Sequence, residues 1–281
     1  MNGPTTKTII RLLTSYFALL LRLGSGRPSV LRHYLTDNLR YLLVERGILS
    51  GAAKDVAEIR AAFEAHAMQG QFKELWFDMN IVPWSVTFSK IFNRAEPVRI
   101  LEIGSWEGRS TLFLLTYFTQ GHLTAVDTWA GSTEGYEYNA TTDLRDLEGR
   151  FDGNLAPCAA RLTKRKGSSL QVLPQLVGEQ QKFDVIYVDG SHHADDILTD
   201  GINAWRMLER GGVLIFDDFV GPFYPRARAN PWWAIDLFLK YHRGECNILS
   251  VNYTQIILQK KVAFTDHAIP LQGQAPFAGS R

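Results

Sequence analysis

Apolar runs that each end in glycine or aspartate place the tightest constraint on how this chain folds. Val98–Ser110 reads VRILEIGSWEGRS, a strand that enters a glycine-containing turn with Glu102 just before it. Phe183–Phe219 carries FDVIYVDGSHH and GGVLIFDDF, two further strands that each end in aspartate. In an open parallel sheet, ligands bind at the carboxyl ends of the strands. We therefore expect a cofactor and a cluster of aspartates to share one crevice.

From Pro97 onward, strand patterns alternate with helical patterns. This predicts an α/β fold, a Rossmann-like, doubly wound, mostly parallel seven-stranded sheet with helices on both faces. Gly131–Gly153 is polar and bears tyrosines, and we interpret it as an insertion over the site. The expected strands are Arg99–Ile103, His122–Asp127, Leu162–Lys166, Phe183–Val188, Gly212–Phe216 and a pair within Asn247–Gln259. The expected helices are Ser110–Phe118, one starting at Leu170–Leu176, Ala194–Leu208 and Trp232–Arg243.

The pattern divides the chain into three parts. Residues 1–95 form a helical and aromatic extension, residues 96–261 the α/β domain, and residues 262–281 a flexible tail rich in Gly, Pro and Gln. Within the extension, helices are predicted over Pro28–Leu49 and Ala52–Gln69. Most aromatic side chains between them and the first strand are expected in the core, and this segment also suits a homo-oligomer.

The N-terminal segment is basic and apolar. The first 36 residues contain no acid but include Lys7, Arg11, Arg22, Arg27 and Arg32. The uncharged run between Arg11 and Arg22 is about half of the ~20 residues that a membrane span needs, so we expect no transmembrane helix. Three interpretations stay open: a helix packed on the protein or a second subunit, peripheral membrane contact through residues 7–32, or a targeting peptide.

Charge and cysteine content narrow the setting. Thirty basic and 29 acidic residues give a net charge of +1, so no overall field favours nucleic acid, and we expect no nucleic-acid partner. The two cysteines show neither metal-ligand spacing nor a disulfide framework, which suits a reducing compartment. The expected location is cytoplasmic.

The glycine turn predicts the cofactor half of the site. Gly104 and Gly108 allow a tight turn and close approach of a ligand to the backbone, and the helix that follows offers free N–H groups. Asp127 ends the next strand, where an acid commonly binds ribose hydroxyls. The alternative is that Glu102 and Asp127 only cap turns. An NAD site prefers Gly-x-Gly-x-x-Gly, whereas this chain has Trp106 in the turn; an S-adenosylmethionine site accepts such a loop.

Three carboxylates predict a metal. Asp189 ends one strand, and Asp217 and Asp218 end the next. Each pair would repel by roughly 4 kcal/mol at 4 Å and an effective dielectric of 20, so a cation must offset them. Hard oxygen ligands suit Mg²⁺ or another divalent cation.

These motifs resemble a known family. LEIGSWEGRST and AVDTW resemble the first two motifs of class I S-adenosylmethionine-dependent methyltransferases. KGSSLQVLPQL, FDVIYVDGSHH and LIFDDF resemble the metal-dependent O-methyltransferases of the catechol and antibiotic-sugar types. The resemblance covers roughly Pro97–Gln259. It implies a cofactor site of Glu102, Gly104, Ser105, Ser110, Asp127, Trp129, Ser168 and Asp189, and a metal site of Asp189, Asp217 and Asp218.

Within that set, the resemblance places Asp127 at the ribose and Ser168 beside the adenine. Trp129 is either a stacking wall or ordinary packing. His192 matches the position at which the sugar type carries its histidine base, and an imidazole suits proton transfer at neutral pH. His193 is its competitor. The acids that follow, Asp195, Asp196 and Asp200, are assigned to helix capping and solvation.

The resulting hypothesis is a divalent-metal-assisted, S-adenosylmethionine-dependent O-methyltransferase that methylates a hydroxyl of a small molecule, sugar or glycan. The loop Gly221–Trp233 combines aromatic and arginine side chains that suit a polyhydroxylated acceptor, although a plain surface loop is an equal alternative. Two rivals stay open. One is a hydroxylase or oxidoreductase-like enzyme on the same fold; the other is a non-catalytic, methyltransferase-like binding protein.

Overall fold

The computed structural model describes residues 27–131 and 144–263, together with several residues between 10 and 21. The predicted tail at 262–281 lies almost entirely outside the described residues, and so do residues 132–143 of the predicted insertion. Among the described helices, none combines the length and apolarity needed to cross a bilayer.

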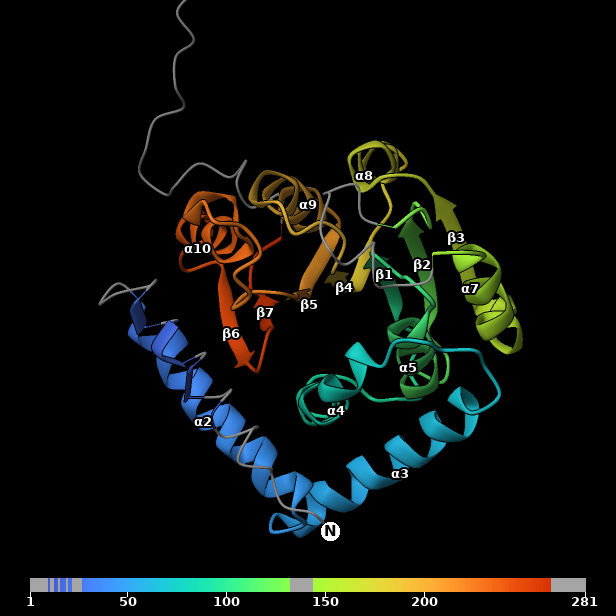
Figure 1. Cartoon of the computed structure of the whole chain (residues 1–281), viewed down its shortest axis with the longest axis horizontal. Coiled ribbons are helices and arrows are strands. Elements are labelled where there is room, and N and C mark those ends of the chain that lie inside the picture. Colours follow the sequence, from blue (N-terminus) through green and yellow to red (C-terminus); the bar gives the residue numbers. More distant parts are fainter. Residues whose placement is uncertain are drawn as a thin grey trace, which may run out of the picture.

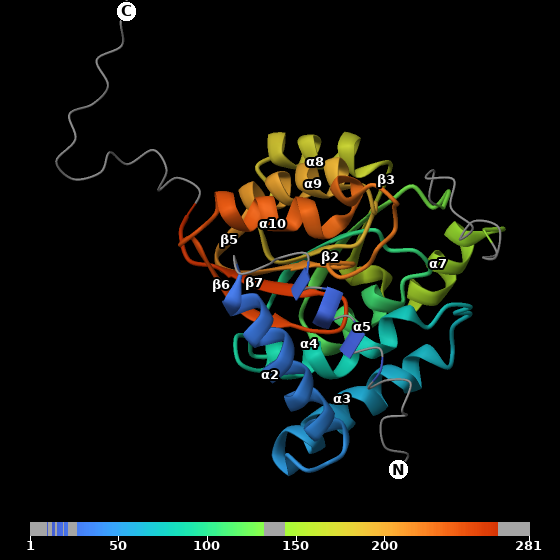
Figure 2. The same cartoon turned by 60° about the vertical axis from the view of Figure 1, so that its left-hand side comes forward.

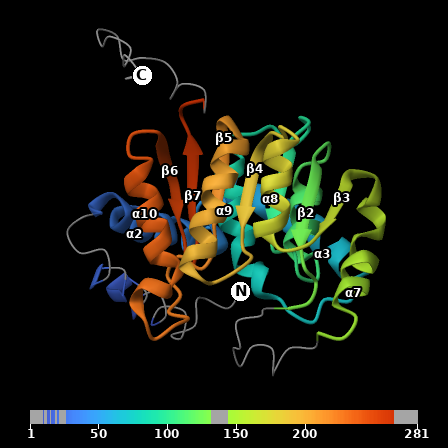
Figure 3. The ribbon, with the colours of Figure 1, turned by 90° about the horizontal axis from the view of Figure 1, so that it is seen from above.

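The centre of the molecule is one seven-stranded sheet in the order β3-β2-β1-β4-β5-β7-β6 (Figure 3). Neighbouring strands from β3 to β5 pair parallel, and β7 is antiparallel to both β5 and β6. The predicted fold class is confirmed. The strands are β1 Arg99–Ile103, β2 His122–Asp127, β3 Leu162–Lys166, β4 Phe183–Val188, β5 Leu208–Phe216, β6 Cys246–Val251 and β7 Ile256–Lys260.

Helices cover both faces of this sheet (Figure 2). On one face lie α8 (Ser169–Gly178), α9 (Ala194–Met207) and α10 (Pro231–Tyr241); on the other lie α4 (Ile81–Phe88) and α5 (Arg109–Tyr117). Successive residues of a strand point to opposite faces, so each strand contributes to two cores. In β1, Leu101 and Ile103 join the core under α8 to α10, and Ile100 joins the core under α4 and α5.

The N-terminal helices wrap the α4 and α5 side. Helices α2 (Pro28–Glu45) and α3 (Ser50–Ala67) form an open V, with α2 beside β6 and α3 beside α5 (Figure 1). The short helix η2 (Trp76–Asn80) leads into α4. As expected, most aromatic side chains here are buried, including Trp84 and Phe88 at 0% exposure, while Trp76 stays 44% exposed.

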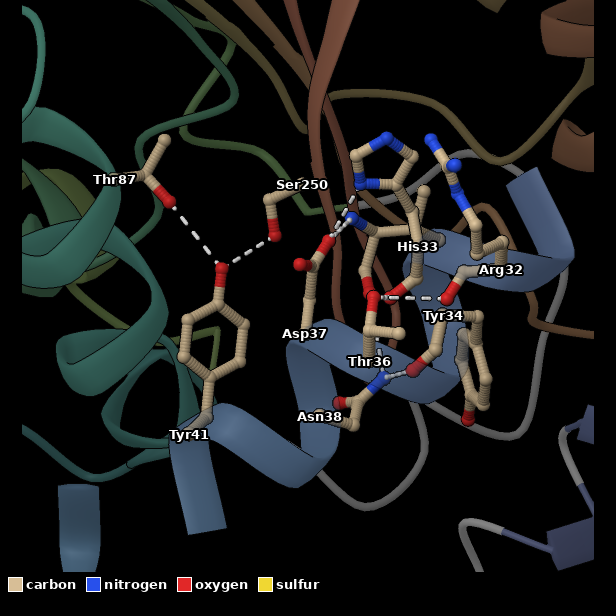
Figure 4. A network of polar contacts seen from close by, with 10 residues as sticks. Arg32, His33, Tyr34, Thr36, Asp37, Asn38, Tyr41, Thr87 and Ser250 are labelled. Atoms are coloured by element: carbon tan, nitrogen blue, oxygen red, sulfur yellow. Dashed lines mark hydrogen bonds and ion pairs between the residues drawn. The ribbon is translucent and has the colours of Figure 1, made fainter. Parts of the chain in front are cut away.

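Polar contacts fix α2 to the edge strand β6 (Figure 4). The buried Tyr41 hydroxyl lies 2.6 Å from Ser250 Oγ and 3.3 Å from Thr87 Oγ1, which ties α2 to β6 and α4 together. Asn38 donates to the Val251 carbonyl at 3.3 Å. The edge strand is thereby covered, which removes an exposed template for strand addition.

The described part of the predicted insertion is helical. Helix α7 (Leu147–Leu155) and the short helix η3 (Ala156–Arg161) follow the residues that are not described and lead into β3. Helix α7 lies against the glycine turn, because a Cβ added at Gly108 would meet Leu155 at 2.2 Å and Phe151 at 3.0 Å. This part therefore packs beside the turn.

Candidate active site

Three carboxylates meet at the carboxyl ends of β4 and β5. Asp189 follows β4 and its N–H donates to the Ile103 carbonyl of β1 at 2.8 Å; the Asp217 N–H donates to the Val188 carbonyl at 3.0 Å. One oxygen from each of Asp189, Asp217 and Asp218 lies within 4.8 Å of the others, close enough to share one metal ion. The topology thus brings together the three residues that the sequence assigned to a metal.

Asp217 is held by four donors. Its Oδ1 accepts from the Asp218 N–H at 2.7 Å and from Thr254 Oγ1 at 2.9 Å. Its Oδ2 accepts from Gln255 Nε2 at 2.7 Å and from the Tyr187 hydroxyl at 2.5 Å. Such a set of donors fixes the orientation of the carboxylate before any ligand binds.

Tyr187 links two of the acids. Its buried hydroxyl also lies 2.7 Å from Asp189 Oδ2, so one phenol stands between the carboxylates of neighbouring strands. Sequence reasoning missed Tyr187, Thr254 and Gln255. The sequence could have indicated Tyr187, because it lies two residues before Asp189. Side chains two residues apart along a strand point to the same face of the sheet. Gln255 had no such signal, because it comes from a strand connection 38 residues after Asp217.

Burial and mutual repulsion make this cluster costly to charge. Burial raises the pKa of Asp189 well above its usual range, and repulsion from Asp217 and Asp218 adds to the effect. Burial likewise raises the pKa of Asp217, with repulsion from Asp218 as the next cause. A dication stabilises the charged forms and lowers these pKa values. An all-oxygen donor set of carboxylates fits Mg²⁺ or Mn²⁺ better than Zn²⁺.

His192 lies beside the acids. Its Nε2 is 3.0 Å from Asp218 Oδ2, and its ring stacks on Phe223 with centroids 4.1 Å apart and planes 7° from parallel. The competitor His193 instead begins α9 and stacks on Tyr224 at 4.4 Å. The structure therefore brings His192 to the cluster, as the sequence predicted.

A single buried asparagine shapes the loop that carries Phe223 and Tyr224. Asn230 is 3% exposed; its Oδ1 accepts from the N–H groups of both residues at 2.7 and 2.9 Å. Its Nδ2 donates to the carbonyls of Tyr224 and Arg226 at 2.9 Å each. These hydrogen bonds hold the loop after β5 in one conformation beside the two histidines. The loop includes the short helix η4 (Ala227–Ala229).

The glycine turn after β1 is shaped by the chain itself. Gly104 has φ +85°, and a Cβ there would lie 2.0 Å from the Asp189 carbonyl oxygen, which only glycine permits. Asp127, at the end of β2, holds the turn: its Oδ2 accepts from the N–H groups of Ser105 and Trp106 at 2.7 and 2.8 Å. Its Oδ1 accepts from the Trp129 N–H at 2.7 Å. In this structure Asp127 therefore caps the turn, as the alternative interpretation of this residue expected.

Glu102 is the fully buried acid of this half, at 0% exposure on β1. Ser110 Oγ donates to its Oε1 at 2.6 Å, and Thr111 donates to its Oε2. Both donors lie in the first turn of α5, so the carboxyl fixes the helix start to the strand. Burial raises the pKa of Glu102 to about 7, although the hydroxyl donors oppose the effect.

The remaining predicted residues divide by environment. Trp129 is 6% exposed and packs on Phe151 with centroids 4.8 Å apart, while the ammonium of Lys164 lies 4.5 Å over its ring. These contacts correspond to the second interpretation of Trp129, ordinary packing in the core. Ser168 is half-buried at the start of α8. The assignment of Asp200 to solvation was wrong: it is 1% exposed on α9, and burial raises its pKa to about 7.

Residues of the N-terminal segment contact the glycine turn and the first residue of α5. The buried Glu107 carboxylate pairs with Arg150 of α7 at 2.7 Å and accepts from the Lys73 N–H at 2.8 Å. Arg109, which begins α5, pairs with Asp78 of η2 at 2.6 and 2.9 Å. Sequence reasoning missed these contacts, because their partners lie about 30 or more residues away along the chain.

A shallow hollow lies away from these residues. A cavity of about 310 Å³ is lined by residues such as Asp55, Phe92, Arg94 and Tyr117. Residues 92 and 94 precede β1, and Tyr117 ends α5, so this hollow lies at the amino edge of the sheet. It touches none of the predicted site residues, and we assign it no part in the site.

Comparison with known proteins agrees with this geometry. Residues 101–219, which span β1 to the end of β5, match the protein family described as a methyltransferase domain. O-methyltransferase hkm8 of Aspergillus hancockii is 30% identical over 156 residues, which are 54% of this chain and 54% of that protein. The chain thus spans about half the length of this curated relative.

A solved structure agrees at the level of the fold. A candidate O-methyltransferase from Klebsiella pneumoniae is 18% identical, with a TM-score of 0.50 over 75% of this chain and 97% of that chain. MycE of the mycinamycin biosynthetic pathway, solved with Mg, SAH and mycinamycin VI, is 16% identical, with a TM-score of 0.49 over 79% and 57% of the two chains. Residues 101–219 are thus similar to a methyltransferase domain, and the curated relative is an O-methyltransferase.

Proposed function

We propose that this protein is an S-adenosylmethionine-dependent O-methyltransferase that uses a divalent metal ion to methylate a hydroxyl of a small molecule, sugar or glycan. The observation that carries the proposal is the convergence of Asp189, Asp217 and Asp218, with His192 beside them, at the carboxyl edge that also holds the glycine turn. The family match supports methyl transfer, and the acids support metal assistance.

The cofactor half fits a nucleoside-type methyl donor. The N–H groups of Ser105 and Trp106 donate to Asp127, which keeps the turn at Gly104 in one conformation against which a ligand can pack. We assign Gly104, Ser105 and Ser110 to the methionine part, Asp127 to the ribose and Ser168 to the adenine. Glu102 supports this half through Ser110 and Thr111. When bound, S-adenosylmethionine supplies an electrophilic methyl group.

The metal half fits a hard dication held by Asp189, Asp217 and Asp218. When bound, such an ion acts as a Lewis acid that lowers the pKa of an acceptor hydroxyl. The chain itself supplies the orientation: Tyr187, Thr254 and Gln255 keep the Asp217 carboxylate fixed. The three carboxylates repel one another, and a bound divalent ion offsets this repulsion more strongly than water molecules do.

His192 is the proposed base. The contact between Nε2 and Asp218 Oδ2 places the His192 imidazole beside the acidic cluster. There the imidazole would take the proton of the acceptor hydroxyl, and Asp218 would stabilise the imidazolium that forms. Stacking on Phe223 holds the plane of the ring during this transfer.

The acceptor is expected to lie under the loop after β5. Phe223 and Tyr224 stack on the two histidines, and Arg228 lies 5.6 Å from the ring of the half-exposed Trp233. Aromatic faces beside guanidinium groups suit a polyhydroxylated acceptor.

The test is calorimetric titration of the protein with S-adenosylhomocysteine, followed by incubation of labelled S-adenosylmethionine and Mg²⁺ with a panel of hydroxyl acceptors. We expect binding of S-adenosylhomocysteine and products that are heavier by a methyl group. A protein that does not bind S-adenosylhomocysteine contradicts the proposal. Products heavier by oxygen would indicate the hydroxylase-like rival, and binding without turnover over a broad panel would indicate a binding protein.

A further inference from the structure

The side chain of Gln255 stands between helix α4 and the acidic cluster. It is fully buried at 0% exposure. Its Oε1 accepts from Trp84 Nε1 at 2.7 Å and from Asn252 Nδ2 at 3.2 Å, while its Nε2 donates to Asp217 Oδ2 at 2.7 Å. The indole N–H can only donate, so it sets which end of the amide faces Trp84. The N–H₂ end must then face Asp217.

Trp84 reaches the cluster by a second contact. Its ring meets the edge of Tyr187 in a T-shaped pair, with centroids 4.8 Å apart and planes at 87°. Tyr187 is the other donor to Asp217 Oδ2, at 2.5 Å. One indole of the N-terminal segment therefore contacts both side chains that fix this carboxylate oxygen.

The orientation of the amide has a direct consequence for the acid. If the amide of Gln255 reversed, its carbonyl oxygen would face Asp217 Oδ2, and two acceptors would repel at 2.7 Å. Asp217 Oδ2 would then lose one of its two donors and be repelled from its present position. Partners that orient a metal ligand commonly change metal affinity about 10- to 100-fold when they are removed.

We propose that Trp84 is a positioning residue for the metal site: it fixes the amide of Gln255, and the amide fixes the carboxylate of Asp217. This inference rests on the proposed function, because it requires that the acids bind a divalent ion. It assigns a role in the site to a helix that precedes the methyltransferase domain in the sequence. A purely structural Trp84 would need only its ring, whereas this role needs its N–H.

The experiment replaces Trp84 by Phe in the full chain, which keeps an aromatic ring and removes the donor. The matched control is Trp205→Phe. Trp205 is also buried, at 2% exposure, but it lies in the core on the other face, and its Nε1 has no hydrogen-bond partner among the described residues. Binding of Mn²⁺ is followed by loss of the free-ion EPR signal, and S-adenosylhomocysteine binding by calorimetry. Both are measured on protein whose circular dichroism shows it to be folded.

We expect Trp84→Phe to weaken Mn²⁺ binding by about tenfold. Trp205→Phe should leave it within about twofold, as for an independent site. Unchanged Mn²⁺ affinity in folded Trp84→Phe overturns the inference and leaves the proposed function standing. A wild-type protein that binds S-adenosylhomocysteine but no Mn²⁺ overturns both the inference and the metal part of the proposed function.

Gln255→Met provides the second variant, since it keeps the length of the side chain and removes both ends of the amide. It should weaken Mn²⁺ binding by a similar factor, and it keeps the inference testable if Trp84→Phe does not fold. In the Gln255→Met background, Trp84→Phe should cost less than a further factor of about two, because the two residues act in series. If the two losses multiply, Trp84 acts without Gln255 and the inference is wrong.

Discussion

Replacing Glu102 by Gln tests how the start of α5 packs beside the glycine turn, through the pH dependence of the stability. Glu102 has no exposed surface and receives hydroxyl donors from Ser110 and Thr111 at the start of α5. Because loss of hydration outweighs those donors, its pKa rises from 4.5 to about 7. Gln has the same shape and no charge, so it removes the titration and keeps a polar partner for the two hydroxyls.

The sign of the effect follows from proton binding. Between pH 4.5 and 7 the folded protein keeps the Glu102 proton that the unfolded chain has lost, so stability falls as the pH rises through this window. The destabilisation is absent below pH 4.5 and complete above pH 7. The rise of the pKa from 4.5 to about 7 corresponds to about 3 kcal/mol of unfolding free energy.

The assay is urea unfolding of the wild type and Glu102→Gln between pH 4.5 and 8. The stability of the variant relative to the wild type should rise by about 3 kcal/mol across this range and stay level above pH 7. Asp200→Asn is the matched control, since Asp200 is also buried, with a pKa of about 7, but belongs to α9 on the other face. Its effect should add to that of Glu102→Gln. A difference that does not change with pH refutes the burial of Glu102 against α5.

Three further outcomes test the site. EDTA or Asp217→Ala should abolish turnover and spare S-adenosylhomocysteine binding, measured by mass spectrometry and calorimetry; turnover that survives both excludes a catalytic metal. His192→Gln should lower kcat by about 10²- to 10⁴-fold at unchanged fold, as for loss of a general base, whereas His193→Gln should stay near wild type. Gly104→Ala should prevent stable folding, because its Cβ would meet the Asp189 carbonyl at 2.0 Å at a φ of +85°; a melting temperature near that of the wild type would contradict this close approach.

The sequence was sufficient for the sheet because its strands are marked locally. Four of the seven predicted strands match the observed bounds, and three of these, β1, β2 and β4, are short, mainly apolar runs with a glycine or an acid at or just after their ends. The fifth strand, β5, begins at Leu208, four residues before the expected Gly212. The two glycines at its start pointed to a turn, but pairing with β4 already begins between Phe183 and Leu208, and a register shift follows. Tertiary pairing overrode the local signal.

The site was predictable where it depends on strand ends and not where it depends on packing. Asp189 and Asp217 end adjacent parallel strands, so topology alone brings them together. Their supporting donors come from other places: Tyr187 from the interior of β4, and Gln255 from the connection between β6 and β7. Nothing in the local sequence marks a glutamine as the partner of an aspartate 38 residues earlier.

The contacts of the N-terminal segment change how the predicted boundary at residue 95 is understood. Trp84 reaches the acids through Gln255, and Asp78 pairs with Arg109 at the first residue of α5. The segment at Lys73 donates a backbone N–H to Glu107, a carboxylate with 1% exposure inside the glycine turn. Two of these contacts satisfy buried polar groups of the α/β domain, Gln255 and Glu107, and a buried group that loses its partner costs about 1–3 kcal/mol. The chain before β1 therefore supports both halves of the candidate site, and the α/β domain lacks part of its own support without it.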